Sequence, residues 1–397
     1  MILIKRMDPL DEGHFLGADD GWPAADEAFR PALRALLKAL REEARLGEGG
    51  RRRAAARIAD ELARRRALSA HEARLGDTLY TLKIERPLVI TGFPRTGTTL
   101  LLNLLARTRG LWSPPLWQLR EPVVPVDAGG VEIDDERWAT EQRRATRESI
   151  DALTRAAPGF PAIRPMDPDW PDECNWLLRN CFSTLANAFT WFVPSYVEFL
   201  GHCDMRPAYA DHARWLRTLL HRRRQQSGQL PRLVLKDPFH LWQLEALLAV
   251  YPDATVIHLH REPDQVAPSL ASLCATWQAV DGDAPRSSAE LGAYTLRMLE
   301  LGLRALERSR ASLPAERFID LPYRELIAAP GEVVRRLGAQ LGFDGEGSAV
   351  AEADRWLRDN RSAPGRHRYK LDDHGFDEEI LDESFAEYRR RFAHLLK

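Results

Sequence analysis

The loop Gly92-Phe-Pro-Arg-Thr-Gly-Thr-Thr99 constrains this fold most, because of the segments on either side of it. Residues 87–91 form a short apolar run typical of a buried strand, and residues 100–106 are apolar on nearly every side, as in a buried helix. A strand that enters a helix through a glycine-rich turn gathers backbone N–H groups and a helix amino terminus around one point. The segment therefore predicts an anion-binding loop.

The cations of the loop indicate which anion to expect. In a P-loop NTPase a lysine follows the second glycine and reaches the terminal phosphates, and the next residue holds magnesium. Thr98 stands in the place of that lysine, and Arg95 is the remaining cation of the loop. The loop thus keeps its anion-binding backbone but lacks the group that serves a magnesium nucleoside triphosphate, which favours a nucleotide without a triphosphate.

The rest of the chain predicts an α/β fold with a parallel sheet. Further strands are expected at residues 232–236, 254–259 and 317–321, with helices at 241–250 and 330–341. Parallel strands need crossover connections, which these helices provide. We therefore expect a P-loop-like parallel sheet of four to five strands flanked by helices.

Two long segments lie outside this pattern. Residues 23–76 repeat alanine, leucine and arginine at helical spacing, with an interhelical turn expected at 47–50, and predict a helical amino-terminal extension over residues 1–85. The α/β domain then covers residues 86–397. Its insertion at 111–230 is mostly helical and tryptophan-rich, and a segment of this length is expected to carry a substrate site.

Composition narrows the class of protein. A formal charge of −2 over 397 residues gives no overall positive potential that would attract a nucleic-acid backbone. The local arginine runs are expected to be solvated helix faces. The chain has no apolar run long enough to span a bilayer or to act as a signal peptide. Its four cysteines lack metal or disulfide spacing. We expect a soluble, cytoplasmic protein without a metal, whose oligomeric state the sequence leaves open.

The loop resembles the 5'-phosphosulfate loop of the family of sulfotransferases that use 3'-phosphoadenosine 5'-phosphosulfate (PAPS), in its bacterial branch. That loop reads Pro-Lys/Arg-Ser/Thr-Gly-Thr-Thr after the first strand. The resemblance implies that the donor is held here by Gly92, Pro94, Arg95, Thr96, Gly97, Thr98 and Thr99.

Later segments resemble the family as well. An arginine at a strand end, with a serine eight residues later, holds the 3'-phosphate in the family, and Arg261 and Ser269 fit this spacing. Tyr323 matches a tyrosine near the adenine, and Arg366 matches a basic residue that closes over the 3'-phosphate. The cytosolic branch stacks a tryptophan on adenine directly after the Thr-Thr pair, where this chain has Leu100, so the stacking group stays open.

The resemblance implies transfer of a sulfuryl group from PAPS to an acceptor hydroxyl or amine by in-line displacement, with adenosine 3',5'-bisphosphate as the product. Arg95 is expected to offset the charge of the leaving oxygen, and Lys236 at a strand end to contact the transferring group. The base is either His240 or Glu173, because the family's usual position is occupied by Pro238. The acceptor is a small molecule, a saccharide or a lipid.

Two other functions compete with this interpretation. A magnesium-dependent nucleotide kinase or NTPase would use Asp237 to hold the metal, but Thr98 in the lysine position argues against it. A nucleotide-binding module without catalysis would act through the arginine-rich helices, and the retained Arg95 disfavours it. His258 and His260 share one face of a strand and are expected to form a packed, hydrogen-bonded pair.

Overall fold

A parallel sheet forms the centre of the structure. The computed structural model describes residues 8–17, 22, 24–126, 133–281, 286–345, 348–359 and 374–396. Within these residues, five parallel strands are arranged in the order β2-β3-β1-β4-β5. Their bounds are β1 Leu88–Gly92, β2 Leu111–Trp112, β3 Arg232–Lys236, β4 Thr255–His260 and β5 Phe318–Pro322. The predicted α/β class is confirmed, and the edge strand β2 is added to the four strands expected from the sequence.

The strand order creates a crevice at the carboxyl end of β1. β1 pairs with β3 on one side and with β4 on the other, so the chain crosses over β1 between these two strands. Ligands of open α/β sheets bind where the order reverses, outside the carboxyl ends of the strands. The loop that follows β1 lies at this position.

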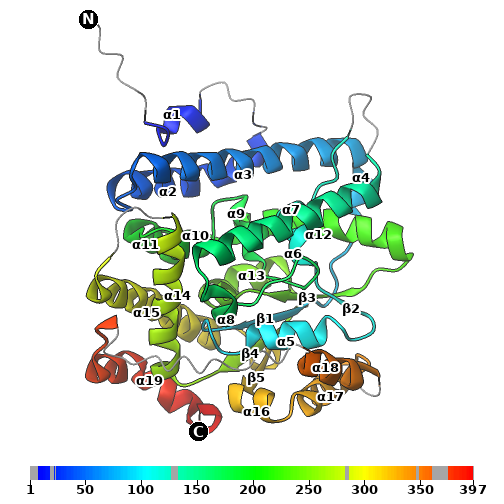
Figure 1. Ribbon diagram of the computed structural model, residues 1–397. Coiled ribbons are helices and arrows are strands. Elements are labelled where there is room, and N and C mark those ends of the chain that lie inside the picture. Colours follow the sequence, from blue (N-terminus) through cyan, green and yellow to red (C-terminus); the bar gives the residue numbers. More distant parts are fainter. Residues whose placement is uncertain are drawn as a thin grey trace, which may run out of the picture.

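The two faces of the sheet carry different cores. Side chains alternate along a strand, so Leu88 and Ile90 pack with α5 and α17 on one face, while Val89 packs into the larger core on the other. The helices of the first face are α5 (Thr98–Leu105), α16 (Tyr323–Ala328), α17 (Pro330–Leu341) and α18 (Ser348–Asp359). Figure 1 shows these below the sheet and most other helices above it.

The larger layer is built mainly from the insertion. Its helices are α6 (Leu116–Arg120), α7 (Asp135–Ala156), α8 (Phe160–Ile163), α9 (Asn175–Arg179), α10 (Ala186–Thr190), α11 (Pro194–His202) and α12 (Arg206–Ser227). The chain returns through η2 (Pro238–Gln243), α13 (Leu244–Val250), α14 (Pro263–Asp281), α15 (Ser288–Ser312), η3 (Ala315–Arg317) and α19 (Glu378–Leu396). The expected helix at 241–250 is thus a 3-10 turn followed by a shorter α-helix.

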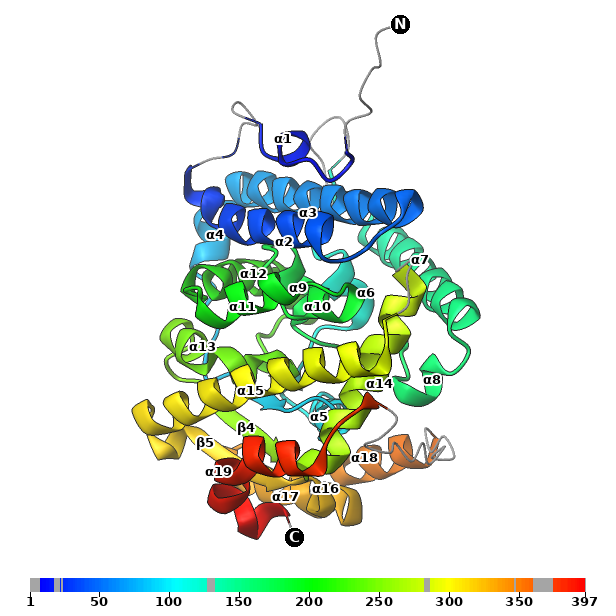
Figure 2. The same ribbon diagram turned by 90° about the vertical axis from the view of Figure 1, so that its left-hand side faces the viewer.

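The amino-terminal helices lie across the insertion as an outer layer (Figures 1 and 2). They are α1 (Glu12–Phe15), η1 (Ala24–Phe29), α2 (Arg30–Glu42), α3 (Glu48–Leu75) and α4 (Asp77–Tyr80). The turn expected at 47–50 comes earlier, since α3 already begins at Glu48. Buried Arg65 of α3 pairs with Asp26 and with Asp211 of α12, which fixes this layer to the insertion. No helix in the described ranges is long and apolar enough to cross a membrane.

Candidate active site

The loop after β1 folds around two glycines that no other residue could replace without strain. Gly92 has a φ of 149°, and a Cβ there would lie 2.6 Å from the carbonyl oxygen of Leu259 on β4. Gly97 has a φ of 90°, and a Cβ there would lie 2.9 Å from the ring of Tyr323. Arg95 also has a positive φ, 73°, which a non-glycine residue adopts only at a cost of about 1–3 kcal/mol. The turn is therefore held in one conformation, with Thr98 at the start of α5.

The guanidinium of Arg95 lies against α14 and α8. Its Nε donates to Oγ of Ser269 at 3.3 Å, and its Nη1 donates to the carbonyl oxygen of Ile163 at 2.6 Å. The carbonyl oxygen of Arg95 accepts a bond from Nη1 of Arg261 at 2.6 Å. Three of the residues proposed to contact a nucleotide, far apart in sequence, are thus joined directly.

Arg261 and Tyr323 form the other wall of the loop. The Arg261 guanidinium lies 4.3 Å from the centre of the Tyr323 ring, and the ring packs on Gly97. Arg261 follows β4 and Tyr323 follows β5, so the sheet order alone brings both to the same edge.

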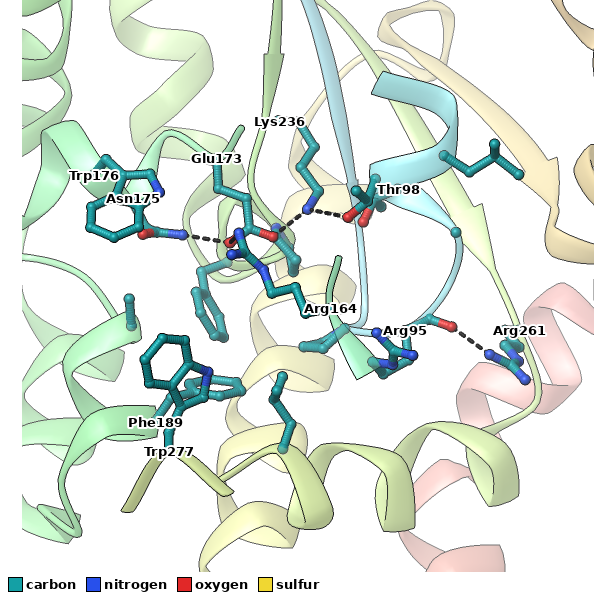
Figure 3. A pocket seen from close by; sticks show the side chains of 18 of the residues that line it. Arg95, Thr98, Arg164, Glu173, Asn175, Trp176, Phe189, Lys236, Arg261 and Trp277 are labelled. Atoms are coloured by element: carbon teal, nitrogen blue, oxygen red, sulfur yellow. Dashed lines mark hydrogen bonds and ion pairs between the residues drawn. The ribbon is translucent and has the colours of Figure 1, made fainter. Parts of the chain in front are cut away.

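Glu173 and Lys236 form an ion pair at the carboxyl end of β3. Nζ of Lys236 also donates to Oγ1 of Thr99 at 3.1 Å, which links the pair to the loop. Glu173 accepts a further bond from Nδ2 of Asn175 at 2.6 Å, and Nη2 of Arg164 lies 3.2 Å from its Oε2. Figure 3 shows the carboxylate of Glu173 between these three donors.

The charges around Glu173 keep its carboxylate ionised. Burial raises the pKa of Glu173, but the positive charges of Arg164 and Lys236 outweigh burial and hold that pKa well below its usual range. Arg164 is held by the same carboxylate and by Asp172, whose Oδ1 accepts a bond from its Nη2 at 2.6 Å. The site thus contains an ionised carboxylate beside two cations.

His240 and Asp237 lie behind the wall of this site. His240 is fully buried, and its Nδ1 is 2.8 Å from the hydroxyl of Tyr209. Burial lowers the pKa of His240 far below its usual value. Asp237 is also fully buried, and its Oδ1 accepts a bond from the backbone N–H of Phe239 at 2.9 Å. Neither side chain faces the space where a substrate or a metal would bind.

A cavity of about 230 Å³ lies between the loop and the insertion. Nine of the residues expected from the sequence line it: Pro94, Arg95, Gly97, Thr98, Thr99, Glu173, Lys236, Arg261 and Tyr323. Gly92, Thr96 and Ser269 support the loop and Arg95 from behind, and Arg366 lies outside the described residues. Sequence analysis missed Arg164 and Asn175, whose local sequence gives no sign that they approach Glu173.

The expected histidine pair belongs to a separate buried network. The rings of His258 and His260 are 4.0 Å apart, and both lie near Asp320. The guanidinium of Arg310 pairs with Asp320 and lies 3.0 Å from Nδ1 of His258. His260 also contacts the Tyr388 hydroxyl, at 3.0 Å from its Nδ1. Although the two histidines and Asp320 could together ligate a metal, Arg310 already supplies the positive charge there.

Comparison with known proteins identifies the family of this chain. The model of the Sulfotransferase family matches residues 87–346, which include the loop, the insertion and all five strands. The chain belongs to the sulfotransferase family. It is therefore an enzyme, and the resemblance seen in the loop is confirmed.

Solved sulfotransferases have the same fold. Sulfotransferase STF1 from Mycobacterium tuberculosis superposes with a TM-score of 0.76 at 26% identity, over 94% of this chain and 96% of that chain. Sulfotransferase STF9 from Mycobacterium avium gives a TM-score of 0.78 at 26% identity, over 92% and 91%. Among curated proteins, omega-hydroxy-beta-dihydromenaquinone-9 sulfotransferase Stf3 of Mycobacterium bovis is 25% identical over 324 residues, 79% of this sulfotransferase and 76% of the relative.

Proposed function

We propose that this sulfotransferase transfers a sulfuryl group from PAPS to the hydroxyl of an amphiphilic acceptor, with Glu173 as the base. The observation that carries the proposal is the Glu173–Lys236 ion pair, which faces the phosphate loop through Thr99. It places a proton acceptor and a cation beside the point to which the loop directs an anion.

The residues of the loop suit the donor. Backbone N–H groups at the start of α5, with Arg95, suit a 5'-phosphosulfate, and Arg261 suits a 3'-phosphate because a guanidinium binds two phosphate oxygens at once. The Tyr323 ring beside Gly97 offers a flat apolar surface for the adenine, in place of the tryptophan that this chain lacks. Among the described residues, the side chains grouped closely enough to ligate a metal are His258, His260 and Asp320, which do not line the cavity. This arrangement weighs against the kinase alternative.

The chemistry then divides among three residues. Glu173 accepts the proton of the acceptor hydroxyl while that oxygen forms its bond to sulfur. The bond between sulfur and the 5'-phosphate oxygen breaks, and Lys236 and Arg95 offset the charge that develops on the departing oxygen. We favour Glu173 over His240 as the base, because His240 does not line the cavity and burial disfavours its protonated form.

An amphiphilic alcohol is the acceptor class that we propose. The name of the Mycobacterium bovis relative indicates that it sulfates an omega-hydroxyl group on a menaquinone-derived lipid. In this chain, the side of the cavity away from Arg261 carries apolar and aromatic side chains, among them Phe189, Trp176 and Trp277 (Figure 3). A hydroxyl on an apolar chain suits such a wall better than a free sugar does.

Calorimetry of the purified protein with adenosine 3',5'-bisphosphate and with adenosine 5'-monophosphate tests the donor. We expect the bisphosphate to bind without magnesium, and Arg261→Ala to weaken it far more than the monophosphate. Tight binding of ATP that depends on magnesium would refute the proposal. Transfer from radiolabelled PAPS to long-chain alcohols, phenols, amines and sugars then tests the acceptor class, and sugars as the preferred acceptors would refute it.

A further inference from the structure

A second hollow opens behind the active-site cavity, between α3 of the amino-terminal layer and α7 of the insertion. Its volume is about 500 Å³, roughly twice that of the cavity. Trp176, Arg179 and Trp277 line both spaces, so these three side chains are the partition between them. Figure 3 shows Trp176 and Trp277 on the side of the cavity away from Arg261. We call this second hollow the distal groove.

The distal groove is rich in arginine. In the described part of the chain, five arginines line it, against two acidic side chains, Asp60 and Glu61. The arginines come from three separate segments, and they are Arg53, Arg57, Arg64, Arg120 and Arg179. A concave surface lined mainly by one sign of charge concentrates ligands of the opposite sign.

Arg120 is the clearest site for an anion in the distal groove. It lies 5.5 Å from the centre of the Trp176 ring, and it forms no ion pair with any residue that the structure describes. Burial lowers the pKa of Arg120, and repulsion by Arg64 and Arg57 lowers it further, although attraction by Glu121 opposes the shift. The Arg64 guanidinium already pairs with Glu121, at 2.6 Å. An anion beside Arg120 would relieve both the burial and the repulsion of its charge.

Apolar side chains also line the distal groove. Ile150 and Leu153 of α7 and Met166 share the wall of the distal groove with Trp176 and Trp277. The cavity alone, at about 230 Å³, is smaller than the roughly 300 Å³ at which pockets for drug-sized molecules begin. A long acceptor would therefore have to continue past the two tryptophans.

We propose that the distal groove is a second acceptor subsite, which binds a carboxylate, phosphate or sulfate at the far end of an elongated acceptor. The apolar part of the acceptor lies along Trp176 and Trp277, and its hydroxyl reaches Glu173. The identity of the reacting end rests on the proposed function, whereas the anion subsite stands on the groove itself. The sulfotransferase thus selects its acceptor by charge at one end and by the hydroxyl at the other.

A matched pair of twelve-carbon compounds tests this subsite by binding alone. 12-Hydroxydodecanoate carries the anion and 1,12-dodecanediol does not, and each is titrated by calorimetry into the full chain without donor. We expect the hydroxy acid to bind about tenfold more tightly, as a charge-assisted hydrogen bond would give. Arg120→Ala should reduce that ratio to about one. Arg52→Ala, at an exposed position of α3 that pairs with Glu48 outside the groove, should leave the ratio unchanged.

A second variant keeps the test decisive if Arg120→Ala fails to fold. Ala152 is exposed on α7 and lines the groove, so Ala152→Glu adds a repulsive charge without removing a packed side chain, and should also abolish the preference. Equal affinities for the two compounds in the unmodified protein, or a preference that survives Ala152→Glu, would overturn the subsite. If the acid is preferred but PAPS transfers nothing to either compound, the subsite stands and the proposed function fails.

Discussion

The backbone N–H of Cys174 donates a hydrogen bond to the carbonyl oxygen of Lys236, at 2.8 Å. This bond joins the insertion to the last residue of β3. Glu173, which directly precedes Cys174, is thereby held against the side chain of Lys236. The main chain therefore places the proposed base beside the proposed cation.

Replacement of the proposed base should remove turnover and spare the donor site. Glu173→Gln keeps the shape of the side chain and its contact with Asn175 but cannot take a proton. We expect kcat to fall by about 10²–10⁴, the range for loss of a general base. Binding of adenosine 3',5'-bisphosphate, measured by calorimetry, should change little. A variant that keeps kcat within about threefold would exclude Glu173 as the base.

The pH dependence of the reaction should depend on Arg164. In the unmodified enzyme the pKa of Glu173 is held low despite burial, because Arg164 and Lys236 favour its carboxylate. In the proposed mechanism the active form is the carboxylate, so we expect kcat/KM to fall only as the pH drops through that lowered pKa. Arg164→Gln removes the largest opposing charge, so the acid limb of kcat/KM should move to higher pH by about one unit or more.

Arg147 provides a control for this experiment. It is exposed on α7 and pairs with Asp167. Arg147→Gln should leave the acid limb where it is in the unmodified enzyme. The acid limb of Arg164→Gln could instead coincide with that of the control. This result would show that the protonation of Glu173 does not control the rate.

Two glycines with similar φ angles allow the effect of backbone strain to be distinguished from the effect of a steric clash with Tyr323. Gly97 (φ 90°) packs on Tyr323, whereas Gly110 (φ 82°) has nothing within 4 Å of the position a Cβ would take. Both alanine variants carry the backbone strain, of about 1 kcal/mol or more. Gly97→Ala alone should also displace the Tyr323 ring and weaken bisphosphate binding at least about tenfold. Equal binding by the two variants would show that Tyr323 does not form part of the nucleotide site.

Glu61 should make the protein less stable as the pH rises. Burial raises the pKa of Glu61 to about 7, although Arg179, Arg57 and Arg64 oppose the shift. The carboxyl group of Glu61 loses its proton near pH 4.5 in the unfolded chain and near pH 7 in the folded chain. Ionisation of Glu61 therefore does not lower the free energy of unfolding below pH 4.5. It lowers that free energy progressively between pH 4.5 and 7, and by its full amount above pH 7. This penalty is on the order of 3 kcal/mol.

Glu61→Gln removes this penalty and should raise the thermal midpoint more at pH 8 than at pH 5. Differential scanning calorimetry at the two pH values measures the difference. Glu141→Gln, at an exposed position of α7 that pairs with Arg137, should show no such dependence. A Glu61→Gln midpoint that rises equally at both pH values would mean that Glu61 is already ionised in the folded protein.

Strands and the loop were predictable because their signals are local. The apolar run at 232–236 coincides with β3, and the helix expected at 330–341 coincides with α17. β2 has only two residues and pairs only with β3, so no periodicity marks it. The expected turn at 47–50 was misplaced because Gly49 and Gly50 lie inside the first turn of α3.

The site was predictable only where a residue sits at a strand end or in the loop. Lys236 ends one buried strand and Arg261 directly follows another, and parallel strands bring such positions together. Glu173 was one of two alternatives, and we favour it because it lines the cavity and His240 does not. The Cys174–Lys236 backbone bond that holds Glu173 there is marked by no sequence pattern. Arg164 directly follows α8, whereas β3 begins only at Arg232, so the position of Arg164 depends on how the insertion folds back.

The partition formed by Trp176, Arg179 and Trp277 has an evolutionary consequence. These side chains belong to α9 and α14, whereas the loop, Lys236 and Arg261 lie at the carboxyl ends of the strands. Substitutions at the partition would therefore change the size or charge of the proposed acceptor subsite and leave the proposed donor site unchanged. After gene duplication, a few substitutions in α3, α7 and α9 would change which acceptor the enzyme binds, and the residues proposed to bind the sulfuryl donor would stay the same.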